Sequence, residues 1–316
     1  MAFFSRKKKT PGWLAISFQP DGICAAHVRR VTDAQPVVEW VSFYPANRNA
    51  LVETLERLEK DRAVSAHECS NLLSLGEYQM LSLEAPAVAP EELKSAVRWR
   101  LKDMLDYHVD DATIDVLSVP GEKGAGSRSD SLFAIAARNQ MIQQRQTIFD
   151  NAKLPLRVID IPEMAQRNMA ALLEPERTAL VVLSLNAEGM LVTVTFGGEL
   201  YLVRQIAVTA AQLQQADSQE TAELHERIAL ELQRTIDHFD RQYQSIPVSQ
   251  LVLAPMGQGA ELLQDYLSTN MHIPVSLLEL GSILDLSRSP ELKQVEMQQR
   301  FFLVIGAALR QEERAL

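Results

Sequence analysis

The chain contains 316 residues, of which 47% are hydrophobic, so it can bury more than one core and we expect two domains or lobes. Its 31 lysine and arginine residues against 41 aspartate and glutamate residues give a formal charge of -10, which excludes a general nucleic-acid binder, because such proteins present a positive face. No stretch approaches the roughly 20 consecutive apolar residues of a membrane span, so membrane contact is expected only peripherally or through a partner.

The N-terminus carries a basic cluster, Arg6, Lys7, Lys8 and Lys9, behind two phenylalanines. No apolar segment with a small-residue cleavage site follows, so this is not a secretory signal peptide. Two interpretations stay open. The cluster is either a solvated tail or a membrane-proximal contact with an anionic surface, where each basic residue contributes about 1 kcal/mol.

The first third of the chain predicts a layer of strands with one helix. Asp21-Gly22 is a strong turn signal between two short apolar segments, which predicts a β-hairpin. Leucines on one face of a charged segment predict the helix. The expected elements are strands over 13–17, 23–28, 36–45, 71–75 and 78–83, and a helix over 48–63.

Proline-rich residues 84–90 then mark a boundary, behind which we expect a self-contained helix-strand-strand-helix unit. Its expected elements are a helix over 90–105, a strand over 113–119, a loop over 121–130, a strand over 131–137 and a helix over 139–154. The apolar stripe of its first helix contains Leu93, Val97, Leu101, Met104 and Leu105.

From residue 178 the opening pattern recurs, because a strand, a glycine-containing turn and a second strand are again followed by a hairpin, at Gly197-Gly198. Two lobes that each open on such a meander predict a duplicated α/β fold of the actin-like type, with ribonuclease H-like lobes. The other elements expected here are a strand over 157–161, helices over 162–173, 223–243, 260–270 and 298–310, and a strand over 249–255.

Cys24 and Cys69 have no zinc-type spacing, which fits a reducing cytoplasm. The Asp/His-rich stretch 106–111 lacks partner ligands at fixed spacing, so no metal site is expected. The sequence contains no Gly-x-Ser-x-Gly motif or placed Ser/His/Asp set, so no catalytic residues are expected either.

Several segments in this order resemble the PilM family of type IV pilus proteins, and within it the MshI branch of mannose-sensitive haemagglutinin (MSHA) pilus systems. They include PEELKSAVRWRLKDML, LRVIDIPEMAQRNMAALL, ELQRTIDHFDRQY and IGAALR. The resemblance covers nearly the whole chain and implies an actin-like fold with an inserted α+β subdomain, where the cell-division protein FtsA carries its own insertion. The implied domains are a first lobe over 1–84 and 155–177, the insertion over 85–154, and a second lobe over 178–316.

The resemblance also implies where nucleotide loops would lie. Each phosphate loop of the family reads Asp-Ile-Gly, in which the acid holds metal or water and the glycine lets backbone amides approach phosphate. Here the matching positions are Ala15-Ile16-Ser17 and Ser184-Leu185-Asn186, so both acids and both glycines are missing. The remnant positions are Ser17, Gln19 and Asp21 in the first loop, Ser184 and Asn186 in the second, and Gly257 and Gly259 in the adenosine-side turn.

Without those acids we expect no ATP hydrolysis, because no group is left to hold a magnesium-bound phosphate and orient a water. No cofactor is expected, and ATP is disfavoured. Binding without hydrolysis stays open, since backbone amides and the Asp21-Gly22 turn can form an anion-binding nest. The alternative for Asp21 is that Asp-Gly simply makes a good turn.

The function implied by the resemblance is a cytoplasmic scaffold at the inner face of the inner membrane. Its partner would be the short cytosolic tail of a single-span, PilN-like protein, of which MshJ is the analogue. A groove between the insertion and the first lobe could accept such a peptide by strand addition or pocket filling. Arg98, Trp99 and Arg100 are candidates for its rim, because Trp and Arg are favoured at interfaces; alternatively, Trp99 packs in the core beside Ala96.

Two alternatives stay open, one in the same class of binding proteins and one in the different class of enzymes and nucleotide switches. A GspL-like component of type II secretion carries a membrane span after the actin-like body, and this chain ends without one. An ATPase, a nucleotide-gated switch or a small-molecule kinase would need the two loop aspartates that are absent.

Overall fold

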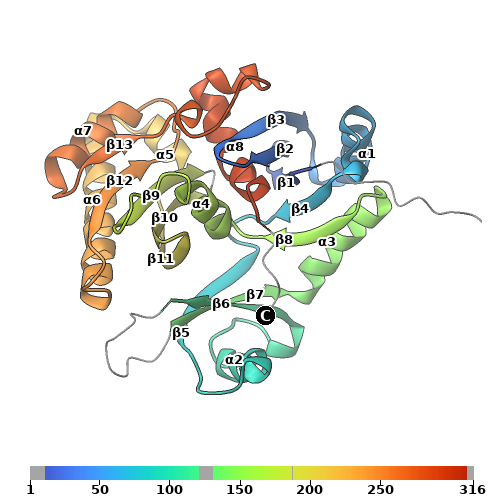
Figure 1. Cartoon of the computed structure of the whole chain (residues 1–316), viewed down its shortest axis with the longest axis horizontal. Helices are drawn as coiled ribbons and strands as arrows, with labels where there is room; N and C mark the ends of the chain where they lie inside the picture. Colours follow the sequence, from blue (N-terminus) through green and yellow to red (C-terminus); the bar gives the residue numbers. More distant parts are fainter. Residues whose placement is uncertain (1–10, 121–130, 187, 312–316) are drawn as a thin grey trace, which may run out of the picture.

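The computed structural model describes residues 11–120, 131–186 and 188–311. The basic cluster Arg6 to Lys9 and the predicted loop 121–130 lie outside the described residues. Figure 1 shows two large α/β lobes beside each other, with a smaller unit below them.

The two large sheets repeat one topology. In each, the first strand in chain order pairs antiparallel with the second and parallel with the fourth, and the remaining strands extend both sides. The first sheet has the order β3-β2-β1-β4-β8, and the second has the order β11-β10-β9-β12-β13. Because these orders match strand for strand, the duplicated-lobe prediction is confirmed.

The strands of the first sheet are β1 (Trp13–Gln19), β2 (Gly22–Val31), β3 (Ala34–Pro45), β4 (Glu68–Leu72) and β8 (Leu156–Asp160). Those of the second are β9 (Ala179–Asn186), β10 (Gly189–Phe196), β11 (Glu199–Ile206), β12 (Val248–Leu253) and β13 (Val275–Leu277). The hairpin turn between β1 and β2 lies at Pro20-Asp21, as the Asp-Gly signal predicts.

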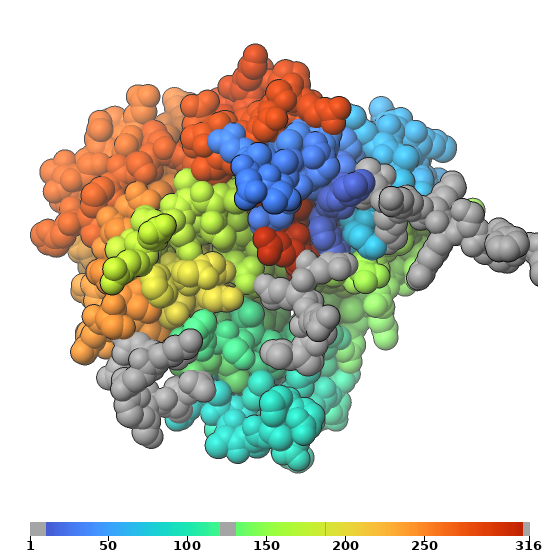
Figure 2. All heavy atoms as spheres, viewed as in Figure 1, coloured from blue at the N-terminus to red at the C-terminus, as the bar shows by residue number. Residues whose placement is uncertain are grey.

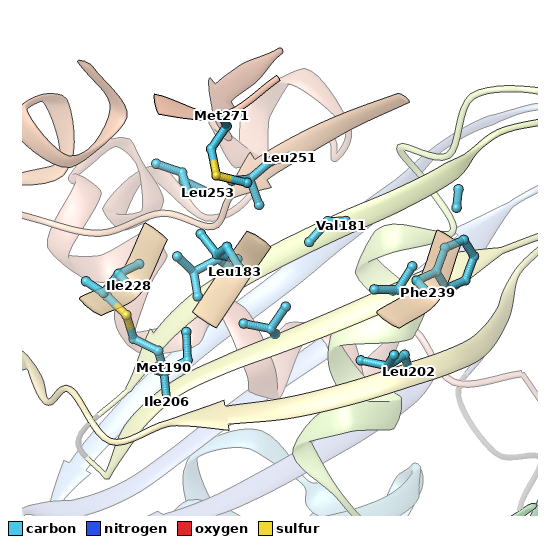
Figure 3. Packing of buried hydrophobic residues seen from close by; sticks show 14 of the residues in the cluster. Val181, Leu183, Met190, Leu202, Ile206, Ile228, Phe239, Leu251, Leu253 and Met271 are labelled. Carbon is cyan, nitrogen blue, oxygen red and sulfur yellow. The ribbon is translucent and has the colours of Figure 1, made fainter. Parts of the chain in front are cut away.

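Helices form layers on the faces of these sheets. The helices α1 and α3 cover the outer face of the first sheet, α6 and α7 cover the outer face of the second, and α4 and α8 fill the layer between the two (Figure 1). In Figure 3, Ile228 and Phe239 of α6 gather with side chains of the second sheet such as Val181 and Leu251. The bounds are α1 (Leu51–Arg62), α3 (Asn139–Asn151), α4 (Pro162–Ala170), α5 (Ala210–Gln215), α6 (Ser218–Gln242), α7 (Ala260–Asn270) and α8 (Val295–Ala308).

The contact between α4 and α8 leaves no room for a side chain at Gly306. A Cβ atom there would overlap the carbonyl group of Ala165, so only glycine lets the two helices approach this closely. The Asn168 side-chain amide on α4 donates to the Gly306 carbonyl at 3.0 Å. Apolar residues of both sheets surround this contact, which makes it the centre of the interlobe core.

The third sheet has the order β5-β7-β6 and, with helix α2, forms the unit that we call the insert. Its elements are β5 (Tyr78–Glu84), α2 (Leu93–Leu101), β6 (Ala112–Val119) and β7 (Ser131–Arg138). Val97 and Leu101 of α2 pack on Leu132 and Ala134 of β7 and close a small core of their own. The predicted stripe of α2 was wrong at Met104, which lies beyond the helix end and is 47% exposed.

The set of helices and strands in this unit differs from the predicted helix-strand-strand-helix order. Strand β5 precedes residue 85, yet it pairs along its whole length with β7 rather than with the first sheet. Helix α3 falls within 85–154, but its Phe149 packs in the outer core of the first lobe. The predicted boundaries missed both points because strand pairing and helix packing are long-range contacts.

The segment between β13 and α8 covers the β3 edge of the first sheet. The Val38 N–H donates to the Asp285 carbonyl at 3.0 Å, and the Asp285 N–H donates to the Pro36 carbonyl at 2.9 Å. Beside them, Arg288 forms an ion pair with Glu39 on β3. The lobes are therefore joined along this edge as well as through α4 and α8.

A first prediction concerns Gly306. Alanine normally stabilises a helix interior by about 1 kcal/mol relative to glycine. Because a Cβ would overlap the Ala165 carbonyl, we expect Gly306→Ala to lower the free energy of unfolding by about 1 to 3 kcal/mol instead, as measured by urea denaturation. The control is Gly281→Ala, where a Cβ would meet only ordinary contacts at 3.8 Å. Equal stability of the two variants would contradict this account.

A second prediction concerns the buried pair His27 and His67, whose ring centroids lie 4.2 Å apart. Burial lowers the pKa of His67 to about 4 and also lowers the pKa of His27. Below about pH 6.5 the unfolded chain therefore binds protons that the folded chain excludes, and stability falls by up to about 1.4 kcal/mol per pH unit for each histidine.

We thus expect urea unfolding to show full stability above pH 6.5 and a loss towards pH 4. His67→Gln should flatten that loss, whereas His272→Gln, at a position where the side chain is not buried, should not. A pH profile unchanged by His67→Gln would count against the role of the pair.

Candidate functional site

The first remnant phosphate turn is bonded to helix α8. The Arg300 Nη1 donates to the Asp21 Oδ2 at 2.9 Å and to the Gln19 Oε1 at 3.3 Å. The Gln19 amide donates in return to the Arg300 carbonyl at 3.4 Å. The guanidinium of Arg300 also lies over the ring of Phe43, 4.3 Å from its centroid. The polar side chains of this turn are therefore already hydrogen-bonded within the protein.

The preceding residue of α8 binds the adenosine-side turn. The Gly257 N–H donates to the Gln299 Oε1 at 3.0 Å, and Gly259 begins helix α7 with a positive φ of 91°. Since Gln299 and Arg300 are consecutive, the first turns of α8 connect this turn to the β1–β2 turn. The structure thus brings Gln19, Asp21 and Gly257 together, through a helix that sequence reasoning had not assigned to the site.

In the second remnant turn, the Ser184 hydroxyl and the Asn186 Oδ1 are hydrogen-bonded within the protein, whereas the Asn186 Nδ2 is buried without a partner. Ser184 is buried, and its Oγ donates to the Gln166 Oε1 on α4, while the Gln166 amide donates to the Val182 carbonyl at 2.9 Å. The Asn186 Oδ1 accepts from the Glu188 N–H at 3.1 Å, within the turn. Ser17 lies in the ladder between Cys24 and Leu72, apart from Ser184.

Phe18, next to the end of β1, points to the outer face of the first sheet. It packs against Phe149 of α3, with ring centroids 5.9 Å apart, and under the guanidinium of Arg145 at 4.4 Å. It belongs to the outer core of the first lobe.

Two buried acids beside these turns were missed by sequence reasoning. Asp160 at the end of β8 forms an ion pair with Arg310 at 2.9 Å, and burial raises its pKa. Glu163 in the first turn of α4 accepts a hydrogen bond from the Tyr78 hydroxyl, and burial raises the pKa of both groups. The sequence signal that could have identified them is their position, because Asp160 ends a strand and Glu163 lies at the start of a helix. Both carboxyl groups already have partners inside the protein.

The predicted rim residues lie on α2, on the far side of the insert. Arg98 forms an ion pair with Asp110 at 3.1 Å, and Arg100 donates to the Glu84 carbonyl, so both hold α2 to its own unit. Trp99 is 76% exposed, which rules out its packing in the core beside Ala96.

A groove of about 300 Å³ lies on the other face of the insert sheet, between it and the first lobe. The strand β8, an edge strand of the first sheet, forms one wall with four consecutive residues. The strands β6 and β7 and the helix α3 form the rest. The lining residues are Leu73, Thr113, Asp115, Ile135, Ala137, Ile142, Gln146, Leu156, Arg157, Val158, Ile159 and Ile161. Because α2 covers the opposite face, Arg98, Trp99 and Arg100 are not among them.

Further along the same face, the insert packs on the second lobe. Phe133 and Val119 share a core with Tyr201 of β11 and Tyr243 beyond α6, leaving a recess of about 130 Å³. Figure 2 shows the insert, in cyan and green, against both the first lobe and the orange second lobe.

The residues described here contain no cluster of three His, Cys, Asp or Glu side chains placed to bind a metal ion. In the same part of the chain, every helix is too short or too polar to cross a bilayer.

No protein-family model matches the chain, and a search of curated proteins found no match either. Solved structures do match. The structure of a PilM-PilN type IV pilus biogenesis complex is 17% identical, covers 94% of this chain and 98% of the matched chain, and superposes with a TM-score of 0.71. A Bacteroides thetaiotaomicron protein of actin-like ATPase fold and unknown function is 9% identical, with coverage of 96% and 99% and a TM-score of 0.52.

The cytoplasmic domain of EpsL, an inner-membrane component of the Vibrio cholerae type II secretion system, is 14% identical, with coverage of 95% and 96% and a TM-score of 0.49. The actin-like fold predicted from the repeated hairpins is thus confirmed by the strand order and by solved relatives of that fold. This chain has the actin-like fold and matches PilM over almost the whole length of both chains.

Proposed function

We propose that this chain is a cytoplasmic scaffold of a type IV pilus assembly platform of the MSHA type. It would sit at the inner face of the inner membrane and bind the short cytosolic tail of a single-span, PilN-like protein. The observation that carries the proposal is the groove between the insert and the edge strand β8. The match to a structure of PilM in complex with PilN supports it at the level of the fold.

The free edge of β8 is suited to binding an extended chain. It pairs with β4 on one side and with no strand of the described residues on the other. Backbone N–H and C=O groups on that side can therefore pair with an added strand, which would set the register of the tail. With five residues, β8 offers a short edge, so the tail needs side-chain anchors as well.

Those anchors would be apolar. Ile135 of β7, Ile142 of α3, and Leu156 and Val158 of β8 all line the groove. A volume of about 300 Å³ is at the small end of ligand sites, enough for a few aliphatic side chains rather than a folded domain. The partner is therefore an extended segment with apolar residues at alternate positions.

We further propose that the chain is not an ATPase and acts as a pseudo-ATPase scaffold. Hydrolysis would need a free carboxylate to hold a magnesium-bound phosphate and orient a water. Asp21 is bonded to Arg300, Asp160 to Arg310 and Glu163 to Tyr78. Gln299 and Arg300 of α8 also engage polar groups of the β1–β2 turn and of the adenosine-side turn.

A third prediction tests the groove. The partner probe is a synthetic peptide of the cytosolic tail of the PilN-like protein from the same cell. Ile142→Asp places a charge in the apolar wall, and we expect it to weaken binding at least about tenfold in calorimetric titration, because burying a carboxylate costs several kcal/mol. The matched control is Leu262→Asp on α7, where the side chain is 63% exposed and away from the groove. Equal affinity of the two variants would locate the peptide elsewhere.

A fourth prediction concerns ATP. Titration with magnesium and ATP should give no binding heat, and no phosphate should be released, because the turns are bonded to α8. The same sample titrated with the peptide serves as the control for active protein. Tight ATP binding would instead favour a nucleotide-gated switch.

A further inference from the structure

Residues 73–78 connect β4 of the first lobe to β5 of the insert, and we call them the hinge segment. Leu73, at its start, lines the peptide groove, and its N–H donates to the Asp160 carbonyl at 2.9 Å. Tyr78, at its end, is the first residue of β5. The groove lies between the two bodies that this segment joins, so its conformation affects the width of the groove.

The hinge segment contacts the first remnant phosphate turn. The Ser74 Oγ donates to the Phe18 carbonyl at 3.4 Å, just after the end position of the missing Asp-Ile-Gly. The Ser74 N–H donates to the Glu77 Oε2 at 2.9 Å, and Glu77 forms an ion pair with Arg145 of α3. Arg145 in turn covers the Phe18 ring. These bonds link one side of the hinge to the first lobe.

The hinge segment also contacts the second lobe. Burial raises the pKa of the Glu188 carboxyl group in the β9–β10 turn, the second remnant phosphate turn, and the nearby Leu75 N–H opposes that rise, so Glu188 lies beside the hinge segment. Leu75 directly follows Ser74, whose Oγ donates to the Phe18 carbonyl. Both turns that would face phosphate in an actin-like ATPase therefore touch the hinge.

At its end, the hinge is fixed to α4 by a buried hydrogen bond. The Tyr78 hydroxyl donates to the Glu163 Oε2, and the Glu163 side chain is fully buried. A buried carboxylate that loses its donor is costly, so this bond strongly favours one position of β5 relative to α4. Helix α4 lies between the two large sheets. Through this bond, the position of the insert is fixed relative to both lobes.

Building on the proposed function, we propose that Tyr78, Glu163 and Glu188 are positioning residues of the peptide groove. None of them lines the groove, and they act through the hinge segment by favouring the groove width that accepts the tail. The apparent affinity of such a site falls with the fraction of molecules in the competent arrangement. A tail in the groove would, reciprocally, favour the hinge position that keeps Leu75 beside Glu188 of the second lobe.

The test uses the full chain and the same synthetic tail peptide. We expect Tyr78→Phe and Glu188→Ala to weaken peptide binding by about 2- to 30-fold, the range found for residues that act on a site without touching it. The control variants are Tyr107→Phe, which removes a hydroxyl elsewhere in the insert, and Glu261→Ala on the exposed face of α7. Both should bind like the wild-type chain. Glu188 is exposed, so its variant keeps the test valid if Tyr78→Phe fails to fold.

A second readout separates positioning from general stability. Peptide binding to the wild-type chain should slow amide hydrogen exchange in residues 73–78 and in the β9–β10 turn, which does not line the groove. In Glu188→Ala, which removes the carboxylate beside Leu75, the turn should no longer respond, although residues 73–78 still do. A general loss of stability in the variant would not by itself abolish the exchange response of the β9–β10 turn.

The outcomes distinguish the two proposals. If the wild-type chain does not bind the peptide, the proposed function fails, and the positioning role fails with it. If the wild-type chain binds, and Glu188→Ala binds equally well with an unchanged response of the β9–β10 turn, the groove stands and the positioning role is overturned. Weaker binding by Glu188→Ala together with the lost response supports both.

Discussion

The close approach of α4 and α8 is the constraint on which the rest of the structure depends. Both helices lie in one layer between the two sheets, and at Gly306 the backbone of α8 touches the Ala165 carbonyl of α4. Polar residues of α4 then reach both sides of this layer. Asn168 binds α8, and Gln166 donates to Val182 and Thr193 of the second sheet. These bonds fix how the lobes are oriented, since unsatisfied amides in this core would be costly.

That orientation has opposite consequences at two places. On the side of the β1–β2 turn, it directs Gln299 and Arg300 of α8 at Gly257 and Gln19. On the side of β8, the described residues leave a groove of about 300 Å³ between the sheet edge and the insert. The ion pair between Arg300 and Asp21 is partly exposed and contributes little stability by itself. Its effect is to engage, within the protein, hydrogen-bond donors and acceptors that a bound phosphate would need.

Local patterns predicted the elements well, and failed where a contact partner lay far away in the chain. The Asp21-Gly22 hairpin and the Val97 and Leu101 stripe depend on neighbours within a few residues, and both are present. The partner of β5 is β7, which follows a helix and a further strand, so adjacency to β4 suggested the wrong unit. Trp99 was placed at the groove because its residue type suits an interface, yet the face that α2 covers depends on which side of β7 it packs.

The sequence by itself determined the duplicated lobes, because strand periodicity and turn residues are local properties. The ion pair of Arg300 with Asp21, the bond between Tyr78 and Glu163, and the lining of the groove were decided only by the tertiary structure. Arg300 and Asp21 are separated by 279 positions in the chain. Such pairs depend on how the layers of helices and sheets pack against one another. A pattern within a short stretch of sequence does not encode that packing.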